Sequence, residues 1–455
     1  MSVSRVEAFA DLEAEEGPAL PDSLMAFCQA PQRFLLDMAL TGPDARFRMN
    51  EETFLVLSDP TSIHAVLNGK LDEFEKGAVI EIPREFWRQG IITVEGAGWT
   101  EQHGMLAPLF TRRRIRQLEP VIAQIAARRI AGWAALPAGE PIDLLTDVNR
   151  FTFDVVAFGL LGIAEGEVAD GLFATFSELD RIESVRLRYL AKRFSGAGQG
   201  GFRRSSSDLA IERLDRLTTA VADERLARAE QPDDLLGAVM ATEAFRAYTP
   251  ERQRVFLADQ VATMLSAGYV TTGESIFWAL YLLARHPAAQ QRAREEILQA
   301  TSAGRGEAPV DAPPFLAAAI NEGHRLYPAV WFMGRVPLRD VRVGDIDIPA
   351  GTRVICSPYV LHRMPALWPE PDQYRPERFL AGASPPVTPR SLIPFGTGMR
   401  ACLGRGLAQM EMAALACLLL ARFEIELVSD APITLAGAFT MHPRERVMFR
   451  LKALS

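Results

Sequence analysis

Apolar positions recur with helical spacing along most of the chain. In residues 117–133, 144–159 and 206–229 they return every three or four positions, which predicts amphipathic helices. Residues 255–284 form a longer apolar stretch, which as one continuous helix would extend roughly 45 Å and cross a whole domain. A further apolar helix is predicted from about Leu407 to Ala421.

Strand-like alternation is limited to a few short segments. Residues 46–49 and 53–57 predict a small hairpin. Residues 341–355 alternate apolar and polar positions between turn signals rich in glycine and proline. The sequence therefore predicts a mainly α fold with a small β region.

The composition indicates one large globular domain. The chain has 455 residues, of which 48% are hydrophobic and 23% charged, so it can bury a large core. No shift in composition divides it, and we expect a single domain over residues 1–455, with residues 1–44 as an N-terminal extension. The Gly/Ser-rich stretch at residues 195–207 is expected to be a mobile surface loop.

Charge, cysteine spacing and hydropathy exclude several classes of protein. The net charge of −8 argues against nucleic acid as the main partner. The four cysteines show no paired or zinc-type spacing, and no apolar run is long enough for a signal peptide or a membrane anchor. We therefore expect a reduced, cytoplasmic protein without a membrane anchor.

One segment combines a cysteine with four glycines. Residues 395–406 read FGTGMRACLGRG, directly before the last predicted apolar helix, and glycine lets the backbone pass close to a flat, bulky group. Cys402 precedes a helix N-terminus, where the dipole and unpaired N–H groups favour thiolate. Such a thiolate is a soft axial ligand of the kind that drives O–O cleavage by haem iron. The alternative is a structural cysteine, our interpretation of Cys28, Cys356 and Cys417.

This segment resembles the haem-binding signature of the cytochrome P-450 superfamily, Phe-x-x-Gly-x-Arg-x-Cys-x-Gly, at every position. Glu322-Gly-His-Arg325 resembles the family's Glu-x-x-Arg helix, and Pro376-Glu-Arg-Phe379 resembles its Pro-Glu-Arg-Phe segment. The resemblance covers roughly residues 45–450. It implies the cytochrome P-450 fold, with the haem between the long central helix and the helix that follows the cysteine loop.

The resemblance also implies roles for residues outside the signature cysteine. Glu322, Arg325 and Arg378 are implied to form a buried charge network behind the haem, away from substrate. Contacts with the cofactor, haem b, are implied for Trp99, His103, Arg335, Phe395, Gly398, Arg400 and Gly404. For the candidate propionate contacts, the alternatives are a histidine packed in the core and a solvated arginine.

Residues 267–273 (AGYVTTG) resemble the family's oxygen-activation segment with one departure, because Val270 stands where the family has an acid. Thr271 is retained, and its hydroxyl can bond the carbonyl of Ala267 and open the helix beside the iron. Glu274, one turn beyond Val270, is a candidate replacement for the missing carboxylate; alternatively, it faces solvent or a salt bridge. Thr271 and Glu274 are therefore the candidate catalytic residues.

The implied substrate pocket is apolar and aromatic, which suits a lipophilic molecule. Its candidate residues are Ala267, Val270, Val330, Phe332 and Phe439. Residues 79–92 are a further candidate wall, and the loop at 195–207 is expected to join two lid helices.

The basic run Arg112–Arg116 is either a solvated helix end or, as the resemblance implies, part of a docking face for an acidic electron donor. We expect no flavin or iron–sulfur module after Ser455, and therefore expect electrons from a separate ferredoxin or flavodoxin with its reductase.

The predicted function is that of a haem-thiolate monooxygenase, an oxidoreductase with iron held by Cys402. It would insert one oxygen atom from O2 into a lipophilic metabolite by hydroxylation or epoxidation, in secondary metabolism. Two alternatives stay open. Val270 leaves room for a peroxide-driven or oxidative-coupling variant, and a haem-based ligand binder without turnover would carry the same cysteine signature.

Overall fold

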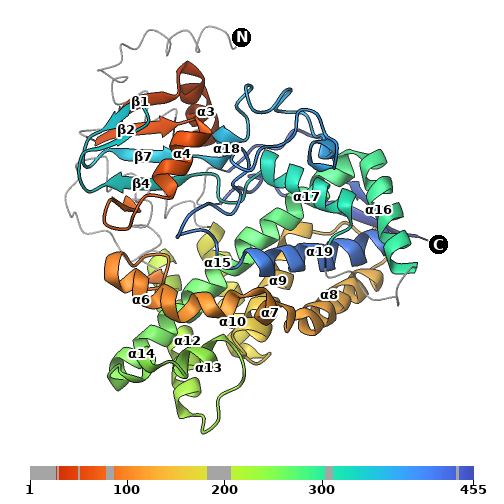
Figure 1. The fold of residues 1–455 in the computed structure, drawn as a ribbon. Helices are drawn as coiled ribbons and strands as arrows, with labels where there is room; N and C mark the ends of the chain where they lie inside the picture. The colour runs from red at the N-terminus through yellow and green to blue at the C-terminus, as the bar shows by residue number, and fades with distance from the viewer. Residues whose placement is uncertain are drawn as a thin grey trace. The chain divides into compact units, whose positions relative to one another are not determined.

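The structure is a computed structural model that describes residues 27, 30–49, 52–77, 87–181, 206–302, 311–436 and 440–454 (Figure 1). Most of the predicted N-terminal extension and residues 195–205 of the predicted lid loop lie outside these ranges. The chain divides into two compact units. Unit 1 comprises Met1–Val79, Ala318–Cys402 and Ala431–Arg446, and unit 2 comprises Ile80–Ala317, Leu403–Asp430 and Val447–Ser455. The single domain with its boundaries stays a prediction.

Unit 1 is built around a five-stranded sheet in the order β1-β2-β7-β4-β3 (Figure 1). Its strands are β1 (Asp44–Met49), β2 (Glu52–Leu57), β3 (Phe74–Glu75), β4 (Met333–Pro337) and β7 (Arg353–Cys356). β2 and β7 run parallel, with Leu55 opposite Val354, whereas the other neighbours are antiparallel. A separate antiparallel pair is formed by β5 (Val341–Val343) and β6 (Ile346–Ile348). The predicted N-terminal hairpin is therefore one edge of a larger sheet.

An apolar core in unit 1 joins this sheet to α4 (Pro60–Leu67). Leu55 from β2 and Ile63 from α4 are both fully buried in it. α4 begins where the side chain of Asp59 accepts the N–H of Ser62 at 2.7 Å, with proline at the first helical position. The other helical segments are α3 (Pro31–Thr41), α18 (Pro358–Leu361), the 3₁₀ turn η5 (Pro376–Phe379) and the part of α17 (Pro314–Leu326) from Ala318 onward.

Unit 2 is mainly helical. Its helices before the long central one are α6 (Gly96–Leu106), η3 (Ala107–Phe110), α7 (Arg112–Arg116), α8 (Glu119–Ala134), α9 (Leu144–Asp154), η4 (Val155–Leu160), α10 (Glu167–Arg181), α12 (Ser206–Ala227), α13 (Leu235–Met240) and α14 (Glu243–Arg246). The later helices are α15 (Pro250–Arg285), α16 (Pro287–Ser302) and α19 (Arg405–Arg422). Two antiparallel strands, β8 (Phe423–Leu427) and β9 (Phe449–Ala453), complete the unit.

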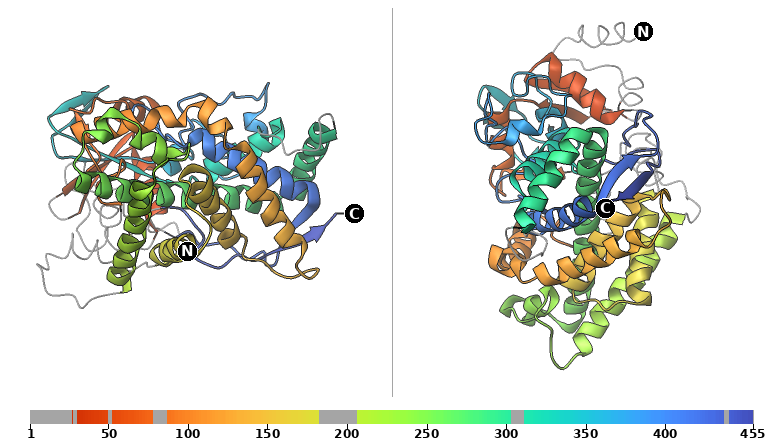
Figure 2. Two further views of the ribbon diagram at one scale, coloured as in Figure 1. Left: turned by 90° about the horizontal axis from the view of Figure 1, so that it is seen from below. Right: turned by 90° about the vertical axis from the view of Figure 1, so that its right-hand side faces the viewer.

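α15 is the long helix that the apolar spacing predicts, and α9, α12, α16 and α19 pack along it (Figures 1 and 2). It has 36 residues and begins earlier than predicted, because the side chain of Thr249 accepts the N–H of Arg252 and caps the helix. Most of its side chains from Phe256 to Leu283 are buried on every side, as expected for a helix that runs through a core.

The predicted helix at residues 144–159 differs in type over its last turn and a half. Regular α9 ends at Asp154, and Val155–Leu160 continue as a π-helix in which the N–H of Leu161 donates to the carbonyl of Val156 at 2.9 Å. Apolar spacing over so few residues does not distinguish the two helix types. The mainly α fold with a small β region is confirmed, and no helix among the described ranges is long and apolar enough to cross a bilayer.

Candidate functional site

Two oppositely charged side chains are fully buried on α17. Glu322 and Arg325 lie one turn apart, and neither side chain reaches solvent. Arg325 donates Nε to Glu322 Oε2 at 2.7 Å and Nη2 to Oε1 at 2.8 Å, a bidentate arrangement. Because both ions are shielded from water, removal of either one deprives the other of its bidentate partner inside the core, which is costly.

The remaining donors of Arg325 hold the loop that follows α18. They bind the carbonyl oxygens of His362 at 3.0 Å, Pro371 at 2.5 Å and Gln373 at 3.0 Å. The guanidinium carbon also lies 5.2 Å from the centre of the Trp368 ring, within range of a cation–π contact. One buried guanidinium therefore organises this whole loop.

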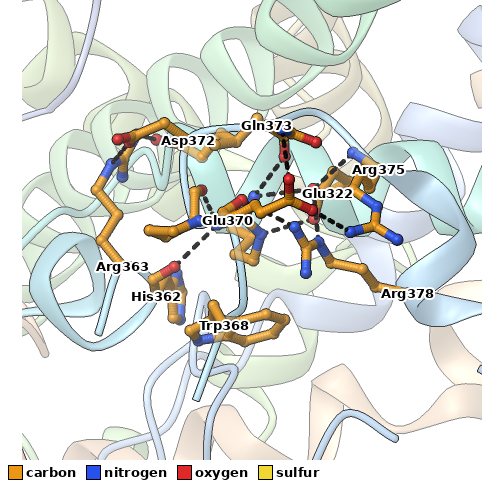
Figure 3. Close-up of polar contacts among 12 residues, drawn as sticks. Glu322, His362, Arg363, Trp368, Glu370, Asp372, Gln373, Arg375 and Arg378 are labelled. Carbon is orange, nitrogen blue, oxygen red and sulfur yellow. Dashed lines mark hydrogen bonds and ion pairs between the residues drawn. The ribbon is translucent and has the colours of Figure 1, made fainter. Parts of the chain in front are cut away.

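Glu322 is contacted from a second segment, the one that contains Arg378. The backbone N–H of Arg375 donates to Glu322 Oε1 at 2.8 Å, and Arg378 Nε lies 3.4 Å from the same oxygen. Arg378 also donates to the carbonyl of Glu370 at 2.9 Å. Burial lowers the pKa of Arg378, and Glu322 opposes that shift. The structure thus brings together the three residues for which a charge network is predicted (Figure 3).

His362 connects this network to the start of the cysteine segment. It is fully buried, and while its carbonyl accepts from Arg325, its ring Nε2 accepts the backbone N–H of Ile393 at 2.9 Å. The carbonyl of Ile393 in turn accepts the N–H of Gly396 at 3.0 Å. Burial, together with Arg325 and Arg363, lowers the pKa of His362 well below its ordinary value, so the ring is neutral. The sequence carries no motif that singles this histidine out.

The loop that leads to Cys402 turns on glycines. Gly396 and Gly398 have φ values of 68° and 78°, which L side chains rarely adopt. A Cβ on Gly398 would lie 2.5 Å from Asn68 Oδ1, so the loop passes directly over the end of α4. Within the loop, the N–H of Cys402 donates to the carbonyl of Phe395 at 2.9 Å. These contacts fix the backbone on both sides of the turn.

The described cysteines differ sharply in environment. Cys356 and Cys417 are buried, and burial raises the pKa of both thiols to about 12. Cys402 is exposed and lies three residues before the start of α19. Cys28 lies outside the described residues. Cys402 is thus the described cysteine whose sulfur is accessible to a ligand group.

The predicted oxygen-activation segment lies in the middle of α15. Thr271 donates Oγ1 to the carbonyl of Ala267 at 2.7 Å, the bond that the sequence predicts. Both residues are partly exposed, as are Ser266 and Gly268 beside them, whereas Val270 is buried. Glu274 is only 2% exposed, which excludes a solvent-facing side chain.

The candidate propionate contacts are distributed over both units. In unit 2, the rings of Trp99 and His103 on α6 stack with their centroids 4.5 Å apart. In unit 1, Arg335 is buried on β4 and donates to the carbonyl of Gly334 at 2.7 Å, and Arg400 is partly exposed in the cysteine loop.

The candidate substrate residues before β4 alternate in exposure. Val330 and Phe332 are partly exposed, and Trp331 between them is buried, with its carbonyl accepting Ser357 Oγ at 2.6 Å. Phe439 and residues 79–86 of the further candidate wall lie outside the described residues.

The basic run forms α7, which packs against the start of α19. Ile115 is buried there, and a Cβ on Gly406 would lie 4.0 Å from its Cγ2. Two of the arginines are engaged in ion pairs, Arg114 with Asp233 at 2.7 Å and Arg116 with Asp311 at 3.3 Å. Among the described residues, no ion pair is found for the exposed side chains of the other two arginines, Arg112 and Arg113.

Comparison with known proteins places these features in one family. A family profile described as Cytochrome P450 matches residues 30–448, which is most of the chain. The chain belongs to the cytochrome P450 family. The predicted fold and enzyme class are thereby confirmed: this cytochrome P450 is a haem-thiolate monooxygenase, an oxidoreductase that binds haem iron and receives electrons from a redox donor.

Individual relatives of this cytochrome P450 are distant. The cytochrome P450 monooxygenase sphH of Aspergillus fumigatus is 27% identical over 425 residues, which cover 87% of this chain and 78% of the relative. The cyclooctat-9-en-7-ol 5-monooxygenase of Streptomyces melanosporofaciens is 27% identical over 410 residues, which cover 88% and 86%. A crystal structure of the cytochrome P450 CYP102L1 shares the fold, with a TM-score of 0.78, 22% identity and coverage of 96% of this chain and 98% of that one.

The residues of this cytochrome P450 fit a haem group. Cys402 presents one soft, exposed sulfur, and a glycine turn removes side chains from the backbone beside it. The other two described thiols are both buried and protonated at neutral pH. Within unit 1, the guanidinium of Arg400 in the same loop has donors of the kind that carboxylates bind.

Proposed function

We propose that this cytochrome P450 holds haem b through Cys402 and inserts one oxygen atom from O2 into a lipophilic small molecule. The supporting observation is the exposed position of Cys402 at the end of a glycine turn, three residues before α19. A helix N-terminus stabilises a thiolate, and the iron needs a thiolate as its axial ligand. Burial raises the pKa of Cys356 and Cys417 to about 12, so neither is suited to this role.

When bound, the haem supplies the iron that activates dioxygen. The loop residues Phe395, Gly398 and Gly404 would give it a close, flat contact surface. Its propionates would be bound by four side chains: Trp99, His103, Arg335 and Arg400. The stacking of Trp99 on His103 supports this assignment, because it fixes the orientation of the imidazole before any ligand is bound.

Thr271 would support proton delivery during oxygen activation. Its hydroxyl donates to the carbonyl of Ala267, so the lone pairs of Oγ1 are available to accept a hydrogen bond from a water or an acid that carries the proton. Val270 has no proton to give. Glu274 lies one turn further along the same helix and is buried, and we propose it as the carboxyl that replaces the missing acid.

The substrate would be lipophilic and bound by Ala267, Val270, Val330, Phe332 and Phe439. Three of these, Ala267, Val330 and Phe332, are partly exposed apolar side chains, as expected in a binding site for apolar molecules. By its name, the Streptomyces relative oxygenates an alcohol at a defined carbon, which supports hydroxylation as the type of reaction.

Electrons would come from a separate ferredoxin or flavodoxin with its reductase. Arg112 and Arg113 are exposed on α7, beside the first turn of the helix that follows Cys402, and would attract an acidic protein. Arg114 and Arg116 contribute less than the sequence suggests, because Asp233 and Asp311 neutralise them. We place the reaction in the cytoplasm, since the cysteine spacing is that of a reduced protein.

A peroxide-driven reaction is the second candidate, because Val270 removes the acid on which delivery of protons to O2 usually depends. Purified enzyme supplied with O2, NADPH and a surrogate ferredoxin system should form product from a verified ligand. Product with hydrogen peroxide alone would favour the second candidate, and product from neither would indicate a haem-based ligand binder.

The ligand assignment has its own test. Reduced enzyme with carbon monoxide should show the strongly red-shifted Soret band of thiolate ligation. Cys402→Ser should lose that band, whereas Cys417→Ser, a buried cysteine on α19, should keep it. A band that survives the first substitution and is lost with the second would overturn the assignment.

A further inference from the structure

α9 packs closely on α15 at the oxygen-activation segment. Two glycines on α15 make this approach possible. A Cβ on Gly273 would lie 2.0 Å from Asn149 Oδ1 of α9, and one on Gly268 would lie 2.6 Å from Val156 Cγ2 of η4, which continues α9. Neither glycine has a side chain that could interlock with α9. The glycines therefore contribute no side-chain contact that would fix the relative rotation of the two helices.

A hydroxyl on α9 makes such a contact. Thr152 is fully buried, and its Oγ1 lies 2.8 Å from the carbonyl oxygen of Tyr269 on α15. The carbonyls of Val148 and Asn149 in its own helix are further away, both at 3.1 Å. A hydroxyl has one hydrogen to donate, and the shortest contact is the one between the helices.

Tyr269, whose carbonyl accepts this bond, lies in the sequence between Ala267 and Thr271, the two residues that are hydrogen-bonded in the oxygen-activation segment. Tyr269 is two positions from both Ala267 and Thr271, so it points to the opposite side of the helix, rotated by about 200°. Its ring is packed among aromatic side chains of α9 and α10, including Phe153 at a centroid distance of 5.9 Å. Contacts with α9 and α10 therefore hold both the ring and the carbonyl of Tyr269. They lie on the side of α15 opposite to Thr271.

We propose that Thr152 is a positioning residue for Thr271. Its hydrogen bond to the carbonyl of Tyr269, together with the packing of the Tyr269 ring, fixes the rotation and height of α15 in the stretch between Gly268 and Gly273. The hydroxyl of Thr271, bonded to Ala267 on the other side, is held in place as a result. The proposal rests on the proposed function, in which Thr271 supports proton delivery. Misplacement of a reacting group by about 1 Å is enough to cost about 100-fold in rate.

The test uses two substitutions of Thr152 and one control. Thr152→Val keeps the shape of the side chain but removes the donor, and Thr152→Ser keeps the donor. Thr218→Val on α12 is the matched control. Thr218 is also buried, and within the part of the chain that the structure describes its hydroxyl bonds only carbonyls of its own helix, Leu214 at 3.0 Å and Asp215 at 3.3 Å.

Two quantities are measured on the full-length enzyme: amide hydrogen exchange of residues 267–275, and product formed per NADPH. In Thr152→Val, exchange in this stretch should become about fivefold faster, the factor expected for one lost hydrogen bond, and coupling should fall. Thr152→Ser should keep both quantities at their wild-type values, and Thr218→Val should change neither.

The outcomes separate this proposal from the proposed function. Unchanged hydrogen exchange at residues 267–275 in Thr152→Val would show that the bond from Thr152 to Tyr269 does not hold α15 in place, whether or not the enzyme turns over. Faster exchange with unchanged product per NADPH would overturn the positioning role and leave the monooxygenase assignment intact. A wild-type enzyme that forms no product would overturn the proposed function, while the exchange data would still decide whether Thr152 anchors α15.

Discussion

The ring of His362 accepts the backbone N–H of Ile393 at 2.9 Å, and this hydrogen bond joins the buried charge network to the cysteine segment. The same residue binds Arg325 through its carbonyl, so the side chain and the main chain of His362 face two different parts of unit 1. A change in this ring should therefore affect both the stability of the unit and the order of the loop that carries Cys402.

His362→Leu removes the acceptor and leaves a buried N–H on Ile393 unsatisfied, so the free energy of unfolding should fall by about 1–3 kcal/mol. His362→Gln retains an acceptor and should lose less. His286→Leu, an exposed histidine at the end of α15, is the control. Urea unfolding at pH 7.5 measures all three, and equal losses in the Leu and Gln variants would contradict the role of the acceptor.

The pH dependence of stability gives an independent check on His362. Its folded-state pKa is lowered, whereas in the unfolded chain the ring binds a proton below about pH 6.5. Since the unfolded state then binds more protons, the stability supplied by the neutral ring is complete above pH 6.5 and is lost as the pH falls below it. Wild type should thus lose more stability than His362→Gln between pH 7.5 and 5.5, and parallel curves would disprove the buried neutral ring.

The ion pair of Glu322 and Arg325 should be worth far more than an exposed pair in the same region. Arg325→Met removes the bidentate partner of the buried Glu322 and leaves only the longer ion pair with Arg378, so we expect a loss of about 3–5 kcal/mol together with reduced haem content. Arg375→Gln breaks the exposed pair with Glu370 and should cost less than about 1 kcal/mol. Thermal unfolding and haem absorbance per protein are the measurements, and similar losses in both variants would contradict the difference in burial.

Val270 should limit the coupling of oxygen activation to product. Acid–base assistance is worth about 10²–10⁴-fold, and valine provides none, so Val270→Asp should change product per NADPH more than it changes substrate affinity. Glu274→Gln should depress turnover if Glu274 is the replacement acid. Tight coupling in wild type that neither substitution alters would mean that Val270 only lines the pocket and that the protons arrive by another route.

Electron transfer from an acidic donor should depend on Arg112 and Arg113 more than on their neighbours. The reduction rate should fall as ionic strength rises, and fall further in the Arg112→Glu/Arg113→Glu variant. The matched control is Arg114→Gln/Arg116→Gln, whose charges are already paired with Asp233 and Asp311. A stopped-flow reduction rate that responds to neither salt nor charge reversal would contradict docking at Arg112 and Arg113. It would leave the assignment as a monooxygenase unaffected.

Local patterns in the sequence predicted the contacts that are close in sequence. The bond from Thr271 to Ala267 and the pair of Glu322 and Arg325 follow from helical spacing, because residues three or four positions apart share a face. The cap at Thr249 was missed, although a threonine before a proline is a local signal.

Contacts between segments that are distant in the sequence could not be predicted from such local patterns. The bond between His362 and Ile393 and the bond between Thr152 and Tyr269 join residues 31 and 117 positions apart, respectively. Neither pair has a spacing that any periodic rule connects, and both depend on how whole elements pack. The family motifs predicted Arg378 beside Glu322, but not the backbone N–H of Arg375, which binds the same carboxylate oxygen at shorter range.

The parallel pairing of β2 with β7 sets a time order on folding in the cell. β2 is complete when Leu57 has been synthesised, yet its partner strand begins only at Arg353, about 300 residues later. At about 5–20 residues per second, the ribosome needs roughly 15–60 s to supply it. Throughout that interval the apolar edge of β2 is a template for pairing with other chains. The sheet of unit 1 is therefore begun by the first strands to emerge and closed only after three quarters of the protein has been made.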